Sequence, residues 1–355
     1  MVDTSKFDDL GFLLKPENVA WYEDGKVRIL DRRIYPVRTE FVVCERHEDV
    51  AQAIADMVTQ SGGPYTAAAM GMALAAYEVK DAPEAEVREH LTKAAYTLSH
   101  ARPTTTAKMQ VVTARCLEAA EKALDEGVHG EALIEVLAQK AFDLLDGMYT
   151  QCESASAHLA KHVPQGGTVM TQCFAEAYVG MIIRHCRRLG NEIKMICPET
   201  RPYFQGARLT ASVASEMGLD VTLITDNMPA YVLSQGMVDL FTSAADVITM
   251  DGYVVNKVGT LQIAISANRY GVPYFCTGTP NKGHPTIDTV KIEQRDPELV
   301  TMAMDLKVTH PEVKGYYPAF DITPPELVGA IVTDRGLYSP YDLESYPGPL
   351  TGVGL

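Results

Sequence analysis

The sequence predicts an α/β protein in which a smaller, strand-opened and mostly helical N-terminal domain precedes a C-terminal domain built on a Rossmann-like parallel sheet. Helical periodicity dominates residues 47–154, whereas residues after 166 form short apolar runs separated by helical stretches. A chain of 355 residues is long enough for two cores. We therefore place the domains at residues 1–150 and 151–355.

The N-terminal domain is predicted to open with strands. Residues 19–44 alternate apolar and polar side chains around the turn Asp24-Gly25, which indicates a hairpin or meander. From His47 the spacing becomes helical until the breaker Ser61-Gly62-Gly63-Pro64. Further helices are expected at residues 67–77, 85–99, 108–126 and 130–154.

The C-terminal domain is predicted from five apolar runs that are typical of buried parallel strands. These runs end at Cys173, Glu199, Asp226, Asp251 and Thr277. They follow one another at steps of about 26 residues, the length of one strand and one crossover helix. Because ligands of open parallel sheets bind beyond the carboxyl ends of strands, we expect Cys173, Asp226 and Asp251 on one crevice. The tail, residues 315–355, is rich in Pro, Gly and Tyr and is expected to wrap the sheet or a partner subunit.

Composition excludes several classes of function. The chain has 31 basic and 46 acidic residues, a net charge of −15, which argues against nucleic acid as a partner. The N-terminus lacks the pattern of a signal peptide and no segment is apolar enough for a membrane span. Seven scattered cysteines without framework spacing indicate reduced thiols, and we expect a cytoplasmic protein.

Two strand ends carry residues suited to proton transfer. Cys173 precedes a helical pattern, where a helix N-terminus favours a thiolate, although a strand-end cysteine often only fills the core. Asp226 either caps the next helix or transfers protons.

Two loops have the composition of an anion site. Residues 200–208 combine two arginines, an amide and a glycine before a helix, and residues 256–260 combine Asn256, Lys257 and Gly259. A solvated lysine is the alternative for Lys257. No metal site is predicted, because His158 and His162 have i, i+4 spacing without a third ligand, and no dinucleotide or P-loop motif is present.

Several longer motifs are recognisable. They are Glu199–Ala211 (ETRPYFQGARLTA), Thr222–Met228 (TLITDNM), Val255–Thr260 (VNKVGT), Ile292–Pro297 (IEQRDP) and Pro318–Leu327 (PAFDITPPEL). With these motifs the whole chain resembles the methylthioribose-1-phosphate isomerase family, which shares its fold with ribose-1,5-bisphosphate isomerases and the regulatory subunits of translation factor 2B.

The resemblance implies a set of site residues. It implies Cys173 and Asp226 as the catalytic acid/base pair. It implies substrate contacts from Ser61, Gly62, Gly63, Arg102, Gln205, Asn256 and Lys257. Two positions depart from the family pattern: Gln60-Ser61-Gly62-Gly63-Pro64 stands where the family has R-G-A-P, and Asp251-Gly252-Tyr253 stands where it has Asn-Gly-Asp.

The expected function is therefore conversion of a 5-substituted ribose 1-phosphate, 5-methylthioribose 1-phosphate first, to the ribulose 1-phosphate without metal or cofactor. The loss of a guanidinium at Ser61 keeps ribose 1,5-bisphosphate and 5-deoxyribose 1-phosphate open as substrates. A non-catalytic sugar-phosphate sensor, like the translation-factor relatives, is the rival from another class. The resemblance also implies a homodimer.

Overall fold

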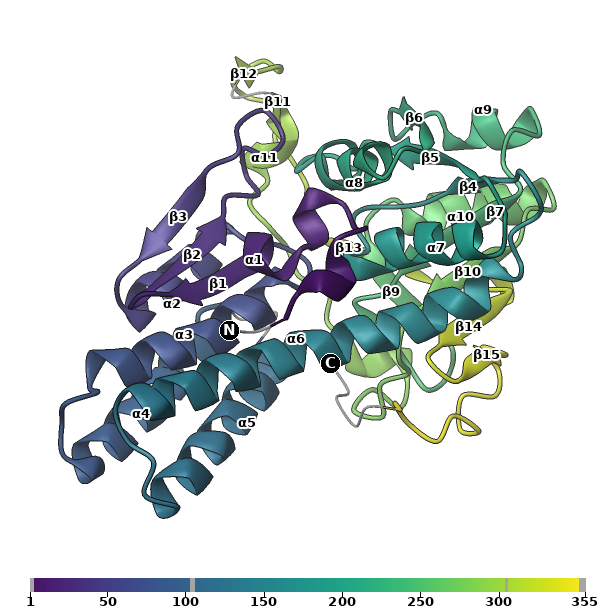
Figure 1. The fold of residues 1–355 in the computed structure, drawn as a ribbon. Coiled ribbons are helices and arrows are strands. Elements are labelled where there is room, and N and C mark those ends of the chain that lie inside the picture. The colour runs from purple at the N-terminus through teal and green to yellow at the C-terminus, as the bar shows by residue number, and fades with distance from the viewer. Residues whose placement is uncertain (1–2, 103–105, 304–305, 351–355) are drawn as a thin grey trace. The chain divides into compact units, whose positions relative to one another are not determined.

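The computed structural model describes residues 3–102, 106–303 and 306–350 and divides into two compact units (Figure 1). The first unit ends at Tyr149 and the second begins at Thr150, inside one long helix. Each unit is described by itself below.

A three-stranded antiparallel sheet opens the first unit. Its strands are β1 (Ala20–Glu23), β2 (Lys26–Leu30) and β3 (Phe41–Cys44), in that order. Short helical turns at Ser5–Phe7, Phe12–Leu14 and α1 (Pro16–Val19) precede it. Asp24 and Gly25 both have positive φ, as a two-residue hairpin with right-handed strand twist requires, so the predicted hairpin is confirmed.

Five helices complete the first unit and confirm its helical character. They are α2 (His47–Ala55), α3 (Gly63–Glu78), α4 (Glu84–Ser99), α5 (Thr106–Asp125) and α6 (Glu131–Ala160). Helix α3 is buried nearly all round, because its alanines and glycine let α2, α4, α5 and the sheet approach closely. It begins at Gly63, earlier than predicted, since Pro64 suits the first turn of a helix.

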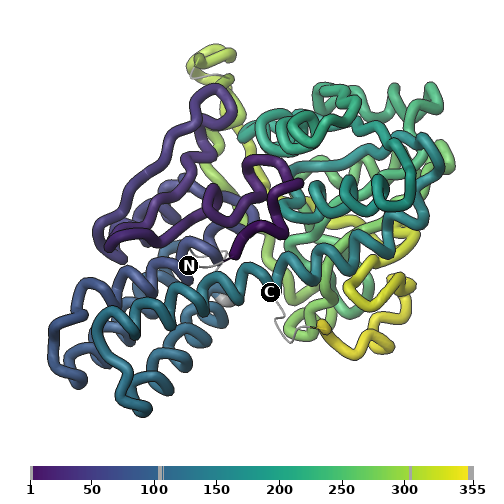
Figure 2. The backbone as a smooth tube through the Cα atoms, viewed as in Figure 1, coloured from purple at the N-terminus to yellow at the C-terminus, as the bar shows by residue number. Residues whose placement is uncertain are grey.

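A seven-stranded sheet forms the second unit (Figures 1 and 2). Its strands are β4 (Thr168–Met170), β5 (Lys194–Pro198), β6 (Asp220–Ile224), β7 (Leu240–Ala244), β10 (Tyr274–Thr277), β14 (Ala330–Thr333) and β15 (Gly336–Tyr338). The order is β15-β14-β10-β7-β4-β5-β6, and all neighbours are parallel except β15. The crossover helices are α7 (Ala177–Arg188), α8 (Ala211–Glu216), α9 (Pro229–Ser234) and α10 (Thr260–Arg269), with a π-helical turn at Gly206–Thr210 before α8.

The fourth predicted strand was wrong. Residues 245–251 were expected in the main sheet, but the strand there is β7, five residues earlier in the chain. Its polar Thr242 and Ser243 are buried because their hydroxyls bond to the Phe275 carbonyl at 2.7 Å and to the Tyr274 hydroxyl at 2.7 Å on β10. An apolar-run criterion therefore misses this strand.

The short segment after β7 belongs to a different sheet. Strands β8 (Val247–Ile248), β9 (Val254–Lys257) and β13 (Phe320–Thr323) form an antiparallel sheet of order β13-β9-β8. Asp251 consequently lies in the turn between β8 and β9 and follows no strand of the main sheet, which corrects its predicted place on the rim.

The tail, residues 315–355, was expected to wrap the sheet, but it contributes strands to two sheets. It supplies β13, β14 and β15, and β14 lies parallel to β10, beside which it is labelled in Figure 1. A helical turn at Pro325–Leu327 lies between β13 and β14. Before the tail come a helical turn at Ile287–Thr289, the short helix α11 (Glu298–Thr301) and the hairpin β11 (Met302–Ala303) with β12 (Leu306–Lys307).

Alternating strand residues build one core on each face of the large sheet. Met170, Phe241 and Ile331 pack with side chains of α9 and α10. Their neighbours Val169, Leu240 and Val332 pack with the end of α6 and with α7 on the other face. Among the described residues, no helix combines the length and the apolar character needed to cross a bilayer.

Gly206 offers a test of the tight packing at the π-helical turn. A Cβ atom built there would lie 1.9 Å from the Pro198 carbonyl oxygen, so Gly206→Ala should cost roughly 3 kcal/mol of stability or more. The matched control is Gly236→Ala, where φ is +65° but no atom lies within 4 Å, and which should cost only about 1 kcal/mol. Thermal unfolding of both variants measures the difference, and equal losses would contradict the packing argument.

Candidate functional site

The strand order of the large sheet reverses direction between β4 and β7. From β4 the chain moves through β5 to β6 on one side, then crosses back to place β7 on the other side of β4. Such a reversal separates the two loops that leave the carboxyl ends of the flanking strands, which is where open α/β sheets bind ligands. The loop after β4 carries Cys173 and the loop after β7 carries Asp246.

The β4 loop and the β5 loop beside it have unusual backbone conformations. Cys173, Glu176, Thr200 and Phe204 all have positive φ, which side chains other than glycine seldom adopt. The Cys173 backbone N–H donates to Thr200 Oγ1 at 3.1 Å, and Thr210 donates its hydroxyl to the Cys173 carbonyl. Strained residues held by neighbouring structure in this way are concentrated at functional sites.

Cys173 is a neutral thiol in this setting. Burial raises its pKa to about 11, while Lys257, a backbone hydrogen bond from Phe174 and Arg295 act in the opposite direction. The predicted thiolate at a helix N-terminus is therefore not what the structure favours, because burial outweighs the nearby positive charges. Helix α7 starts only at Ala177, which removes Cys173 from its first turn.

Lys257 and Arg295 supply two cations close to Cys173. The Lys257 side chain is buried, and burial lowers its pKa, with the Arg295 charge adding to that effect. Lys257 Nζ lies 4.9 Å from the centre of the Phe320 ring and Arg295 Cζ lies 5.7 Å from it. Arg295 is held by Glu293, with contacts of 3.1 and 3.2 Å. Two cationic side chains with little exposure to solvent are suited to binding an anionic ligand.

Asp246 is a carboxyl group that interacts electrostatically with both Cys173 and Lys257. Its charge raises the pKa of the Cys173 thiol and opposes the lowering of the Lys257 pKa. Its backbone N–H donates to the Val255 carbonyl at 2.9 Å, which fixes the start of the loop against β9.

Asp226 lies elsewhere along the same rim. It follows β6, two strands from β4, a separation of about 9.6 Å between strand axes. Its two carboxyl oxygens accept the backbone N–H groups of Thr200 at 2.8 Å and Arg201 at 2.6 Å. This contact holds the β5 loop. It differs from the helix cap that the sequence left open for Asp226, because the next helix, α9, has Met228 at its N-cap position and no side-chain cap.

Gln205 in the β5 loop and Asn256, the neighbour of Lys257 on β9, both have buried side-chain amides. Gln205 Oε1 is buried and makes no hydrogen bond within the described part of the chain, so it is an acceptor available for a ligand hydroxyl. Asn256 Nδ2 donates to Thr260 Oγ1 at 3.0 Å. Asp321, opposite Asn256 on β13, accepts the N–H groups of Gly259 at 2.7 Å and Leu261 at 3.2 Å, which fixes the loop after Lys257.

The remaining predicted site residues belong to the first unit. Ser61 has φ of 58° and precedes Gly62 and Gly63 at the start of α3. The buried Arg32 guanidinium reaches this loop, because its Nη1 donates to the Gln60 carbonyl at 2.6 Å. Arg102 Nη1 lies 3.0 Å from Met57 Sδ. Of the predicted site residues, the second unit thus contains Cys173, Gln205, Asn256 and Lys257. The first unit contains Ser61–Gly63 and Arg102.

Sequence reasoning missed Asp246 and Arg295. The signal for Asp246 was hidden by the strand assignment, since a strand ending at Ala244 would have placed Asp246 on the rim. Arg295 lies in the recognised motif Ile292–Pro297, but no spacing in the sequence connects it with Cys173.

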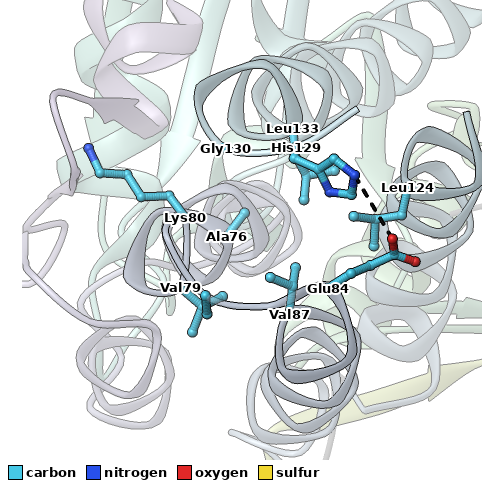
Figure 3. A pocket seen from close by; sticks show the side chains of 10 residues that line it. Ala76, Val79, Lys80, Glu84, Val87, Leu124, His129, Gly130 and Leu133 are labelled. Carbon is cyan, nitrogen blue, oxygen red and sulfur yellow. Dashed lines mark ion pairs between the residues drawn. The ribbon is translucent and has the colours of Figure 1, made fainter. Parts of the chain in front are cut away.

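The helical unit holds a separate pocket (Figure 3). Its walls come mainly from apolar side chains of α3, α4, α5 and α6, including Ala76, Val87 and Leu133. His129 Nε2 and Glu84 form an ion pair of 3.9 Å at its edge. None of the predicted site residues lines it.

Comparison with known proteins gives consistent matches over most of the chain. The Initiation factor 2 subunit family matches residues 60–340. A protein named methylthioribose-1-phosphate isomerase from Thermotoga petrophila is 32% identical over 339 residues, which cover 92% of this chain and 96% of that protein.

Two solved structures are similar in fold and in sequence. The 5-methylthioribose 1-phosphate isomerase of Pyrococcus horikoshii OT3 has a TM-score of 0.80 and 29% identity, over 92% of this chain and 95% of that chain. A structure described as the delta subunit of translation initiation factor eIF-2B from A. fulgidus has a TM-score of 0.78 and 32% identity, over 91% and 96%.

Asp321 makes the stability of the second unit depend on pH. Burial raises the pKa of Asp321 from 3.8 to about 6, so the folded state favours the neutral carboxyl group. The contribution of this group to the free energy of unfolding is therefore complete below its unfolded pKa of 3.8 and is lost as the pH rises through about 6. Asp321→Asn cannot ionise. Its free energy of unfolding, relative to that of the wild type, should therefore increase by on the order of 2 kcal/mol when the pH is raised from 4 to 7.5. Thermal unfolding at both pH values measures this gain. The exposed Asp8→Asn serves as control, and an equal pH response in both variants would contradict the assignment.

Proposed function

Because this chain belongs to the Initiation factor 2 subunit family, we propose that it is an aldose–ketose isomerase that converts 5-methylthioribose 1-phosphate to the ribulose 1-phosphate. The observation that carries the proposal is the pairing of Cys173 with a carboxyl group at the switch point of the sheet, in a chain that is 32% identical to an isomerase over nearly its whole length. Neither reactant nor product requires a redox partner, since the reaction is an internal transfer of hydrogen.

The substrate sets the chemistry that the site must perform. The anomeric oxygen of an aldose 1-phosphate is esterified, so the ring opens only when its oxygen receives a proton as it leaves C1. Hydrogen then moves from C2 to C1, and the C2 hydroxyl loses its proton as the carbonyl forms. One donor and one acceptor of protons are sufficient for these steps.

We assign these roles to Cys173 and Asp246. Cys173 begins the cycle as a neutral thiol, so it either donates its proton or passes it on before acting as a base. Asp246 is the carboxyl group whose charge acts on both that thiol and Lys257. Asp226, the aspartate that the resemblance implied, is proposed to position the β5 loop through its bonds to Thr200 and Arg201.

The phosphate is proposed to bind at the two cations. Lys257 and Arg295 lie beside Cys173, and because the chain as a whole has a net charge of −15, such local cations are necessary for anion capture. Arg102 and the loop Ser61–Gly63 remain proposed substrate contacts from the first unit. Gln205 and Asn256 would orient sugar hydroxyls.

A sensor function is the second candidate, and the similarity to a structure described as an eIF-2B subunit favours it. In that case a sugar phosphate would bind at the same cations and remain unchanged. The substrates ribose 1,5-bisphosphate and 5-deoxyribose 1-phosphate also remain alternatives. We further propose a cytoplasmic homodimer, in keeping with the seven unpaired cysteines and with the family resemblance.

The catalytic assignment is tested by NMR time courses with the three sugar phosphates. Wild-type protein should convert 5-methylthioribose 1-phosphate, and Cys173→Ser and Asp246→Asn should each lower kcat by roughly 10²–10⁴-fold. Asp226→Asn should keep more activity and lose thermal stability, and Cys152→Ser is the control thiol variant. Binding without turnover of any of the three would favour the sensor, and an active Asp246→Asn with an inactive Asp226→Asn would return the role to Asp226.

The phosphate assignment is tested at Lys257. Lys257→Met keeps the length of the side chain but removes its charge, and should weaken binding of substrate and inorganic phosphate by about 1.5–3 kcal/mol, or roughly 10- to 150-fold. Isothermal titration calorimetry measures the affinity. The control is Lys194→Met, whose side chain is mostly exposed and only loosely paired with Asp220 at 3.9 Å. Unchanged affinity in Lys257→Met would remove Lys257 from the phosphate site.

A further inference from the structure

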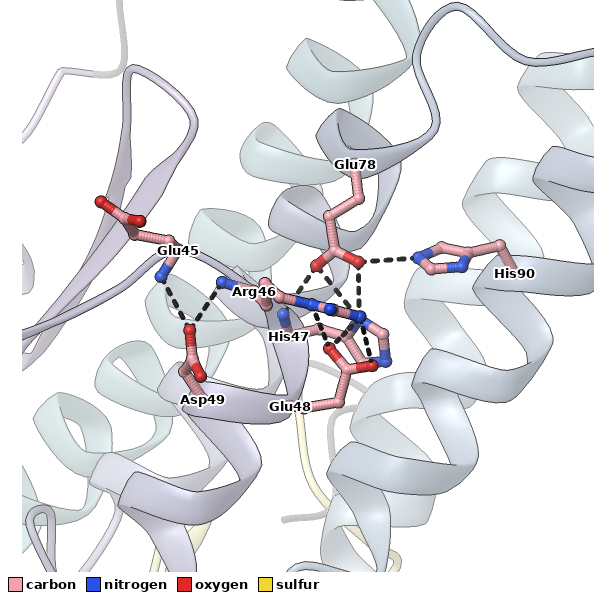
Figure 4. A network of polar contacts seen from close by, with 7 residues as sticks. All are labelled: Glu45, Arg46, His47, Glu48, Asp49, Glu78 and His90. Atoms are coloured by element: carbon pink, nitrogen blue, oxygen red, sulfur yellow. Dashed lines mark hydrogen bonds and ion pairs between the residues drawn. The ribbon is translucent and has the colours of Figure 1, made fainter.

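Two histidines and a glutamate, none of them a residue of the proposed active site, converge inside the first unit (Figure 4). Glu78 ends α3, His47 begins α2 and His90 lies in α4. The His47 Nδ1 atom lies 3.0 and 2.9 Å from the two carboxylate oxygens of Glu78. On the other side, His90 Nε2 lies 2.9 Å from Glu78 Oε2.

These three side chains present their ligand atoms to one small volume. His47 Nδ1, His90 Nε2 and a Glu78 oxygen all lie within 4.8 Å of one another. Donor atoms at the corners of a tetrahedral site with metal bonds of about 2.0–2.1 Å are separated by about 3.3 Å. The observed nitrogen-to-oxygen separations are only slightly shorter, so small side-chain movements would admit an ion.

The site is shielded and its glutamate is held in place. His47 is 3% exposed, and the side chains of Glu78 and His90 are 13% and 24% exposed. The His47 backbone N–H also donates to Glu78 Oε1 at 2.6 Å. Burial opposes ionisation of Glu78, but its bonds from His47 lower its pKa overall, so the carboxylate is charged at neutral pH.

We propose that His47, Glu78 and His90 form a binding site for a divalent transition metal, zinc first, that ties together α2, α3 and α4. Imidazole nitrogens with one carboxylate are a donor set that suits zinc. On binding, each neutral imidazole moves its proton to the opposite ring nitrogen, so the metal replaces two N–H donors without a change in imidazole charge. Glu48 Oε2, 3.3 Å from His47 Nδ1, lies beside the site and can complete the coordination.

This inference does not depend on the proposed function. The ligands come from residues 47, 78 and 90, whose spacing matches no metal motif, and only the packing of three helices brings them together.

The test is zinc titration of the full chain after treatment with EDTA, with a competing chromophoric chelator and thermal unfolding as the two readouts. Wild-type protein should bind one equivalent of zinc and unfold at a higher temperature when it is bound. His90→Ala, the variant of the least buried ligand, and Glu78→Gln, which keeps the side-chain shape, should each weaken zinc binding by about 100-fold or more. Both should lose the thermal shift.

The control is His129→Ala, which removes a histidine that pairs with Glu84 at 3.9 Å and should leave zinc binding unchanged. Far-UV circular dichroism checks that the variants fold. The proposal is overturned if the wild type takes up no zinc, or if His90→Ala and Glu78→Gln bind it as the wild type does, which would assign the uptake to cysteines and the cluster to hydrogen bonding alone.

Discussion

The reversal of strand order at β4 is the constraint on which the proposed site depends. Parallel strands must be joined by crossovers, and a sheet that grows first on one side of β4 and then on the other leaves two loops diverging at the reversal. Cys173 and Asp246 lie on those two loops. Sheet geometry, more than any local motif, therefore places these two residues on neighbouring loops and underlies the proposal that they act together.

Electrostatics and burial then shape what the loops can do. The chain is strongly acidic, yet it places Lys257 and Arg295 where solvent is limited, and Glu293 secures the arginine. Burial works against both the Lys257 ammonium and a Cys173 thiolate. An anionic ligand would relieve the first cost, because its negative charge stabilises the buried ammonium group.

The backbone around the site is held by side-chain-to-backbone bonds from neighbouring elements. Asp226 secures the β5 loop, Asp321 secures the loop after β9, and Thr200 and Thr210 secure Cys173. Each contact joins segments far apart in the chain, so the geometry of the site depends on the whole second unit. The same principle acts in the first unit, where Glu78 joins three helices through His47 and His90.

The sequence by itself determined the α/β class, the opening hairpin, the helices of the first unit and four of the five predicted sheet strands, because apolar periodicity reflects which side chains must leave water. It also identified Cys173, Gln205, Asn256 and Lys257 as candidates through strand ends and motifs. Only the tertiary structure decided that β7 precedes Asp246, since Thr242 and Ser243 are buried by hydrogen bonds to another strand. Arg295 and the cluster of His47, Glu78 and His90 were equally beyond the sequence, because their proximity arises from contacts between elements that no local pattern encodes.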